Sequence, residues 1–298
     1  MPENIGYGYS TASDIAALEK NLQQHLIQLV RIRDPFLGSG GHRLTQEYIC
    51  STLGQYGSVE KHIFKFRGQD YTNWILKLTP RNVAAFHQAP IIVGAHYDTV
   101  PGTPGADDNA SGVAVLLELA HYVAKHPPIR PVWCIAFDME EYGLLGSQAY
   151  ATALKAANQP IRLMLSLEML GYCDRTPQSQ RYPTPWLKRL YPETGDFIGL
   201  IGNLPTIPDL VRLKRHICRA GAKCEWLPMP QQGKLLPDIR RSDHAPFWDL
   251  GYRAVMVTDT SFLRNPHYHK PSDRLETLDL PFMTQVCRGL MTGLTTLT

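Results

Sequence analysis

Apolar residues recur along this chain at two spacings, one typical of helices and one typical of strands. Between residues 13 and 31 they return every three or four positions, at Ile15, Leu18, Leu22, Leu26, Leu29 and Val30. This spacing puts them on one face of a helix. After a glycine-rich break at 38–41 the same spacing continues over 45–53. We therefore predict two surface helices at the start of the chain.

Short runs rich in β-branched and aromatic residues follow, and such runs are typical of strands. We predict strands at 59–66, 73–78, 91–95, 132–137, 163–167 and 254–257. Helical spacing predicts helices at 112–125, 144–157, 209–220 and 281–292. Because strands that alternate with amphipathic helices build βαβ units, the predicted fold class is α/β, with a three-layer α/β/α arrangement around a mostly parallel mixed sheet.

No internal repeat or linker divides the sequence, so we expect a single domain over residues 1–298. Two proline-rich stretches, 172–208 and 228–241, are expected to be irregular insertions. Long irregular segments inside a domain are often walls of a binding site. The alternative is a solvent-exposed insertion without a role.

Composition and charge exclude several classes of protein. With 44% hydrophobic and 19% charged residues, the chain has the make-up of a soluble globular protein. A net charge of +3 with scattered basic residues argues against nucleic-acid binding. No apolar run approaches the length of about 18 residues that a membrane span needs. The start, MPENIGYGYS, has neither the basic nor the apolar part of a signal peptide, which favours a cytoplasmic location, although a trimmed secretory signal would leave the same start.

The six cysteines lie far apart and form no C-x-x-C pair. This spacing argues against a thiolate zinc site and against a disulfide framework. Reduced thiols are therefore expected. Cys218 and Cys224 are close enough in sequence to pair in an oxidising compartment, and that alternative stays open.

Acidic residues and histidines follow the predicted strands where those strands end. His96 and Asp98 follow the strand at 91, residues 138–141 follow the strand at 132, and Glu168 follows the strand at 163. His269 lies beyond the last strand. Because ligands of open α/β sheets bind beyond the carboxyl ends of the strands, we expect these groups to meet at one edge.

Carboxylates that converge on one edge repel one another and lose hydration unless a cation neutralises them. Imidazoles and carboxylates without thiolates suit zinc, with manganese or cobalt as possible substitutes. The candidate ligands are His96, Asp107, Glu141, Glu168 and His269. This set is too large for one tetrahedral catalytic ion and suits two ions that share a carboxylate.

Six segments, in this order, resemble the co-catalytic two-zinc aminopeptidases: AHYDT, PGADDNASG, FDMEEYGLLGS, SLEMLGY, RSDHAPFW and NPHYHKPSD. This family of zinc-dependent exopeptidases is related to bacterial leucyl aminopeptidase, glutamate carboxypeptidase II, the transferrin receptor and glutaminyl cyclases. The resemblance runs from about residue 91 to the C-terminus. It implies the α/β/α fold of those enzymes and hydrolysis of the N-terminal peptide bond by a hydroxide held between two metal ions.

The resemblance also implies a role for each candidate. His96 and Glu168 would hold one ion, His269 and Glu141 the other, and Asp107 would bridge both. The family pattern of a histidine followed by an aspartate four residues later favours His269 over His267. It further implies a cis peptide between the bridging aspartate and its successor, hence at Asp107–Asp108.

Residues beside the ligands receive roles from the same resemblance. Glu140 would be the general base, and Asp98 would orient His96 through its second ring nitrogen. Asp243 either shapes the site or caps a helix, and Asp273 either supports His269 or caps the following turn. Some family members have aspartate where this chain has Glu168, a difference that bears on substrate preference rather than on metal binding.

The implied substrates are peptides with a free N-terminus, without nucleic-acid or membrane partners. Which side chain the enzyme prefers is open, because Trp186, Leu190, Phe197 and Phe262 could line an apolar pocket or belong to local core. The oligomeric state is also open.

Two other functions fit the same scaffold. A glutaminyl cyclase would use one zinc and would have an altered DDNASG region, whereas ADDNASG is intact here. A non-catalytic binding relative would have lost ligands, whereas all five candidates are present.

Overall fold

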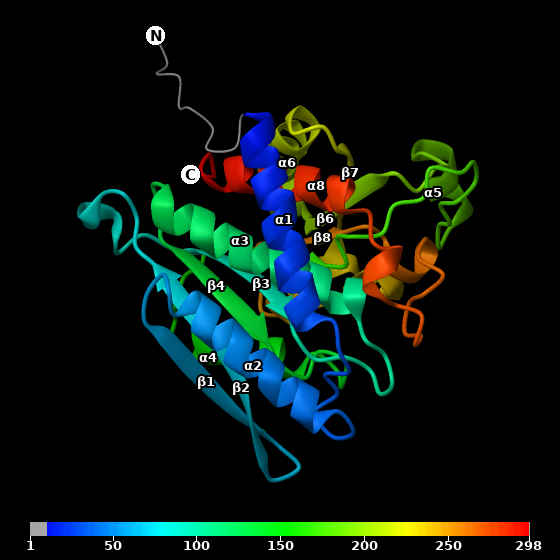
Figure 1. The fold of residues 1–298 in the computed structure, drawn as a ribbon. Helices are drawn as coiled ribbons and strands as arrows, with labels where there is room; N and C mark the ends of the chain where they lie inside the picture. The colour runs from blue at the N-terminus through cyan, green and yellow to red at the C-terminus, as the bar shows by residue number, and fades with distance from the viewer. Residues whose placement is uncertain (1–10, 298) are drawn as a thin grey trace.

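In the computed structural model, which describes residues 11–297, an eight-stranded sheet runs through the middle of the molecule (Figure 1). Its strands are β1 Val59–Phe66, β2 Gln69–Leu78, β3 Ile91–His96, β4 Val132–Phe137, β5 Leu163–Glu168, β6 Phe197–Asn203, β7 Lys223–Met229 and β8 Ala254–Thr258. Their order across the sheet is β1-β2-β4-β3-β5-β8-β6-β7. The central strands β4, β3, β5 and β8 are parallel, while β1, β2 and the β6–β8 pair add antiparallel contacts. The predicted mostly parallel mixed sheet is confirmed.

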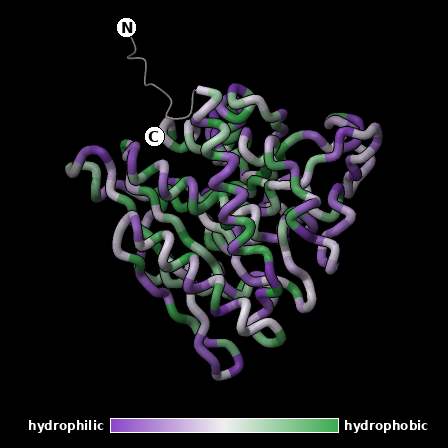
Figure 2. The backbone as a smooth tube through the Cα atoms, in the orientation of Figure 1, coloured by the Kyte–Doolittle hydropathy of each residue, from purple (hydrophilic) through white to green (hydrophobic). Residues whose placement is uncertain are grey.

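Helices cover both faces of this sheet. They are α1 Ala12–Leu29, α2 Ser39–Leu53, α3 Gly112–Lys125, α4 Leu145–Ala156, α5 Pro185–Leu190, α6 Ile207–Arg219, α7 His244–Asp249 and α8 Leu280–Leu294. One apolar cluster lies under α1, α2, α3, α6 and α8, and a second lies under α4 and α7. Neighbouring residues of β3 enter different clusters, Ile91 and Val93 the first and Ile92 the second. Hydrophobic positions therefore run continuously through the central strands (Figure 2).

Most predicted elements agree with the observed ones within a few residues. The largest shift at a helix start is in α2, which begins at Ser39 and so includes glycines expected to be a break. Glycine lowers helix propensity, but α2 buries His42, Thr45 and Ile49 against the rest of the molecule. Tertiary packing outweighs the local preference.

Two strands were not predicted from the sequence, and they correct the expected insertions. β6 lies inside the stretch 172–208, so only 172–196, with the short helix α5, is irregular there. Residues 228 and 229 end β7, which leaves 230–241 irregular. β6 carries two glycines and lies among prolines, signals that suggest a loop. Its pairing with β8 on one side and β7 on the other makes it a strand.

The described part of the chain has no helix that is both long and apolar enough to cross a bilayer. All six cysteines are free thiols, including Cys218 and Cys224. The N-terminal segment on which the expected cytoplasmic location rests lies outside the described residues.

Gly94 in β3 allows the close approach of a buried ring from β4. A Cβ atom built on Gly94 would lie 2.3 Å from Cε2 of Phe137. Since Phe137 is fully buried, the ring has little room to move. We expect Gly94→Ala to lower the free energy of unfolding by about 1–3 kcal/mol. Urea unfolding of the metal-free protein measures this change.

Gly40→Ala is the matched control, because nothing lies within 4 Å of a Cβ atom there. This substitution adds a methyl group to α2 without a clash and is expected to leave stability unchanged or to raise it by up to about 1 kcal/mol. An unchanged unfolding midpoint for Gly94→Ala would show that the packing around Phe137 can relax.

Candidate metal centre

The carboxyl ends of β3, β4 and β5 meet at one edge of the sheet and bring the predicted polar groups together. His96 is the last residue of β3, and Glu168 is the last residue of β5. Glu140 and Glu141 follow β4. His269 comes from the irregular segment after β8 and reaches the same place, where its ring nitrogen lies 3.3 Å from a carboxylate oxygen of Glu141. The sheet-edge prediction for these residues agrees with the structure.

His96 faces three carboxylates. Its Nε2 atom lies 3.2 Å from Oδ1 of Asp108, 3.5 Å from Oε2 of Glu168 and 3.9 Å from Oε2 of Glu140. All four side chains are buried. Within the described residues, His96, Glu140 and Glu168 form one group that could hold a metal ion.

A second group shares His96 with the first and includes Asp108. Oδ2 of Asp108 lies 3.2 Å from Nε2 of His269, so each oxygen of Asp108 faces a different imidazole. His96, Asp108 and Glu141 could also hold an ion together. Asp108 therefore lies between two sets of donor atoms.

The shared position corrects the sequence analysis, which assigned it to Asp107. The Asp107 carboxylate instead accepts hydrogen bonds from the Gly171 amide (2.9 Å) and from Nδ2 of Asn265 (2.7 Å). The predicted cis peptide is wrong by the same one-residue shift, since the cis bond joins Asp108 to Asn109. Adjacent side chains in this loop point in different directions, so only one of the two carboxylates can face the histidines.

Asp98 and Asp273 fix the backbone around the centre. Asp98 accepts hydrogen bonds from the amides of Glu140 (3.0 Å) and Glu141 (3.1 Å), and its Oδ1 lies 3.4 Å from Nδ1 of His96. Asp273 accepts from the amides of Asp107 (2.9 Å) and Asp108 (3.1 Å). Asp273 thus holds the aspartate loop and does not serve either role expected for it.

Asp243 is the residue before α7 and makes no capping hydrogen bond there. Its carboxylate is buried, and both oxygens lack a hydrogen-bond partner in the described part of the chain. Burial, with repulsion from Glu168, raises the pKa of Asp243 to about 7 against the pull of His96. Of its two expected roles, the structure favours shaping the site. His267 bonds to Ser272 and joins neither metal-binding group.

The carboxylates and imidazoles of the centre have strongly displaced pKa values. Burial raises the pKa of Glu140 well above its usual range, and Glu168 and Glu141 add repulsion. Burial and the nearby Asp108 raise the pKa of Glu141 to about 7. Burial alone would lower the pKa of His269, but Asp108 and Glu141 raise it to about 10. Without another cation, the centre must hold protons to limit the repulsion among its acids.

The donor atoms fit a metal better than they fit one another. Nε2 of His96, Nε2 of His269 and Oε1 of Glu141 face the centre and are buried without a hydrogen-bond partner among the described residues. Buried polar groups are seldom left in this state. Nitrogen and carboxylate donors without thiolates are typical ligands of zinc. The residues present therefore fit the predicted zinc ions.

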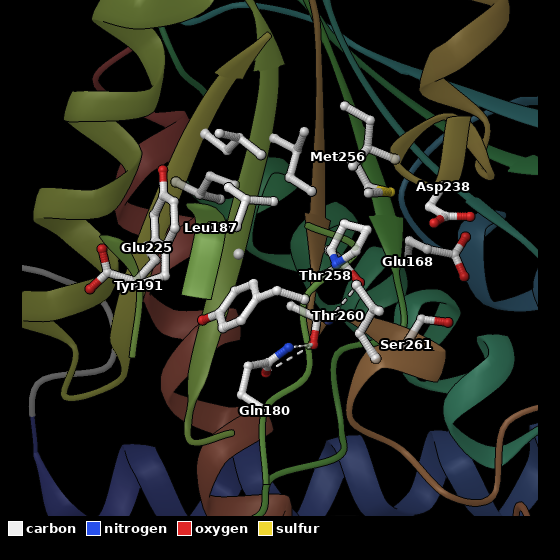
Figure 3. A pocket seen from close by; sticks show the side chains of 18 of the residues that line it. Glu168, Gln180, Leu187, Tyr191, Glu225, Asp238, Met256, Thr258, Thr260 and Ser261 are labelled. Carbon is white, nitrogen blue, oxygen red and sulfur yellow. Dashed lines mark hydrogen bonds between the residues drawn. The ribbon is translucent and has the colours of Figure 1, made fainter. Parts of the chain in front are cut away.

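An apolar pocket opens beside the centre (Figure 3), and together with the open solvent at its mouth it spans about 850 Å³. Glu168 stands at one side of the pocket and Tyr191 at the other. Its wall comes mainly from β6, β7, β8, the segment 260–268 after β8, and the irregular segments 172–196 and 230–241, including Tyr182, Leu187, Phe197, Leu200, Trp226, Met256 and Phe262. Of the four apolar residues considered from the sequence, Phe197 and Phe262 line the pocket. Trp186 and Leu190 are exposed on α5 instead.

Comparison with known proteins relates part of this chain to one family of peptidases. Residues 73–192 match Peptidase family M28. The chain is 40% identical over 212 residues to the protein YfbL of Escherichia coli K12, a match that covers 68% of this chain and 65% of YfbL. It is 38% identical over 218 residues to Aminopeptidase YwaD of Bacillus subtilis 168, covering 71% of this chain and 41% of YwaD. The chain thus spans less than two thirds of the length of these two relatives.

The fold is also found in a solved structure, that of LapA from Legionella pneumophila. The two structures superpose with a TM-score of 0.71 over 96% of this chain and 76% of LapA. At 21% sequence identity this similarity supports the fold and nothing finer.

Proposed function

Because residues 73–192 belong to Peptidase family M28, we propose that this protein is a zinc-dependent aminopeptidase that hydrolyses the N-terminal peptide bond of peptides. The observation that carries the proposal is the position of the Asp108 carboxylate. Its Oδ1 atom lies 3.2 Å from Nε2 of His96, and its Oδ2 atom lies 3.2 Å from Nε2 of His269. The relative YwaD, named as an aminopeptidase, supports the reaction class.

The proposed centre takes two ions. His96 and Glu168 would hold one, His269 and Glu141 the other, and Asp108 would contribute one oxygen to each. When bound, the ions would supply a nucleophilic water at neutral pH and polarise the carbonyl of the scissile bond. The protein supplies the fixed donors, the proton acceptor and the substrate pocket.

Glu140 is the proposed general base. Its carboxylate is buried beside His96 and Glu168, close to the reacting atoms in this scheme. A raised pKa brings a carboxyl group nearer to the working pH, where it can accept a proton and return it to the leaving amine. Asp98 keeps Glu140 in place through its amide and steadies His96 on the same side.

The pocket supports exopeptidase action. Glu168 belongs both to the proposed metal centre and to the pocket lining. An N-terminal side chain in the pocket therefore places the first peptide bond of the substrate next to the centre. Since the lining is mainly apolar, we expect leucine, methionine or phenylalanine at this position.

The alternative of a one-zinc glutaminyl cyclase receives less support. Asp108 faces His96 with one carboxylate oxygen and His269 with the other, which favours a pair of ions rather than one. A non-catalytic relative is disfavoured because no proposed donor is missing. Metal analysis that found one equivalent per chain, together with pyroglutamate formation, would reverse this preference.

A panel of aminoacyl amides tests the proposal. With zinc, manganese or cobalt added, leucine and phenylalanine amides should be cleaved with kcat/KM about 10–200-fold higher than glutamate amide, because the lining is mainly apolar and its acidic residues, Glu168, Glu225 and Asp238, outnumber its one basic residue, Arg241. The N-acetylated forms of the same amides are the controls and should not be hydrolysed. Cleavage of blocked peptides at internal bonds would contradict the exopeptidase assignment.

A further inference from the structure

Arg33 is a fully buried arginine that lies between α1 and α2, outside the segment that matches the family. Among the described residues, no carboxylate forms a hydrogen bond or an ion pair with its guanidinium group. The guanidinium is instead surrounded by backbone carbonyl oxygens. Burying a permanent charge is costly, so its hydrogen bonds must compensate for lost water.

Three of the six carbonyl groups that the Arg33 guanidinium contacts belong to one loop. Its Nη1 atom donates to the carbonyl of Pro104 (2.7 Å), and its Nη2 atom donates to those of Gly105 (2.9 Å) and Asp108 (3.4 Å). Its Nε atom donates to the carbonyl of Tyr97 at 2.9 Å, just after β3. Arg33 thus joins the end of β3 to the loop that carries the shared aspartate.

The same guanidinium is anchored from its own side. Nη1 also donates to the carbonyls of Leu29 (2.7 Å) at the end of α1 and of Arg31 (3.2 Å). The Arg33 amide donates to Oγ1 of Thr99 at 3.0 Å. The guanidinium group is therefore fixed to the end of α1, and through it the position of the loop relative to the sheet is fixed as well.

Asp273 holds the same loop through its backbone amides, whereas Arg33 binds the backbone carbonyl groups. Asp273 accepts from the Asp107 and Asp108 amides, whereas Arg33 donates to the Asp108 carbonyl. Both peptide groups that flank the Asp108 side chain are thus tethered to charged side chains. The Asp108 carboxylate is left to face His96 and His269.

We propose that Arg33 is a positioning residue for the metal centre: its guanidinium holds the loop 104–108 so that Asp108 can present one oxygen to each ion. This inference rests on the proposed function, because it assumes that Asp108 binds metal. Arg33 touches neither substrate nor donor atoms and acts through the backbone. It also places a permanent positive charge near Asp98, Asp108, Glu141 and Asp273, which limits repulsion among these acids before metal binds.

Arg33→Lys tests the proposal because it keeps the charge and removes the planar set of donors. One ammonium group replaces three guanidinium nitrogens, so it cannot keep the contacts of Nε with the Tyr97 carbonyl and of Nη2 with those of Gly105 and Asp108 as well as those of Nη1. Zinc affinity, measured by competition with a chromophoric chelator, should fall about 10–100-fold, as is usual when a group that orients a ligand is lost. The wild-type protein must bind zinc in the same assay. If the wild type does not bind zinc, the proposed function is wrong; if the wild type binds zinc and Arg33→Lys binds it equally well, the proposed role of Arg33 is wrong.

Arg162→Lys is the matched control. Arg162 makes a two-point ion pair with Asp209 at 2.7 and 3.0 Å, just before β5 and away from the carboxyl ends of the strands. This control should lower the melting temperature of the metal-free protein and leave zinc affinity within about twofold, since no ligand-orienting contact is lost. A merely structural role for Arg33 would give the same pattern in Arg33→Lys, which would overturn the proposal.

Gly105→Ala moves the loop without changing charge and covers the case in which Arg33→Lys does not fold. Gly105 has a φ of +61°, and a Cβ atom there would lie 2.2 Å from the Asp108 carbonyl oxygen and 2.8 Å from Nη2 of Arg33. Zinc affinity should fall in this folded variant too. Wild-type zinc affinity in Gly105→Ala would show that the contact between Arg33 and the loop does not position Asp108, and would overturn the proposal.

Discussion

Replacing Glu140 with glutamine is expected to lower kcat by about 10²–10⁴-fold while the zinc content of the protein stays unchanged. The amide has nearly the same shape as the carboxylate but cannot accept a proton from water. Glu140 is buried, and its carboxylate lies 3.9 Å from Nε2 of His96, close to the proposed donors. Turnover of leucine amide and zinc per chain, determined on the same preparation, check the two parts of this prediction.

Glu118→Gln is the control for this substitution. Glu118 is also buried, but it pairs with His25 at 3.1 Å between α1 and α3, away from the centre. Its replacement should leave kcat near the wild-type value. Turnover above a tenth of wild type in Glu140→Gln would exclude Glu140 as the base. Loss of zinc in that variant would identify Glu140 as a ligand, which its place beside His96 and Glu168 also allows.

Separate replacement of the two adjacent aspartates is expected to give opposite results. Asp108→Asn should weaken zinc binding by more than about 100-fold, beyond the usual effect of losing an orienting group, and should remove turnover. Asp107→Asn should keep zinc binding and lower the free energy of unfolding by about 1–3 kcal/mol, because at least one buried donor around it loses its acceptor. The donors are the Asn265 side chain at one oxygen and the Gly171 amide and Ser111 hydroxyl at the other.

Zinc titration and urea unfolding of both variants separate these outcomes. Each variant serves as the control for the other, since both replace a buried aspartate of the same loop with an amide of nearly the same shape. If Asp107→Asn lost zinc and Asp108→Asn retained it, the position of the shared carboxylate would have to be reassigned to Asp107.

The sequence predicted the central strands well because each is a buried apolar run between glycine- or proline-rich turns. β4 and α3 begin and end at the predicted residues. β6 was missed because its two glycines and the nearby prolines resemble a loop, and β7 because it ends in the Leu-Pro-Met of an edge strand. β7 pairs with β6, and β6 pairs in turn with β8, interactions between separate segments that a local pattern does not contain.

The residues of the site likewise divide into those that a local pattern predicts and those that depend on contacts between distant segments. His96, Glu141 and Glu168 could be found because they follow apolar strands, and parallel strands bring their ends together. The choice between Asp107 and Asp108 had no such signal, since side chains in an irregular loop follow no fixed period. Arg33 was not considered, because its partners are backbone carbonyl groups, and every residue has one.

The sequence by itself determined the α/β architecture and the acids and histidines that gather at one edge of the sheet. The spacing of buried residues and the ends of strands are local properties, so the order of residue types along the chain is enough to predict them. Only the tertiary structure decided which aspartate faces both histidines, where the apolar pocket lies and what holds the loop beneath them. Those features depend on the direction of individual side chains and on contacts between segments far apart in the chain, such as Arg33 with Asp108 and Asp107 with Asn265.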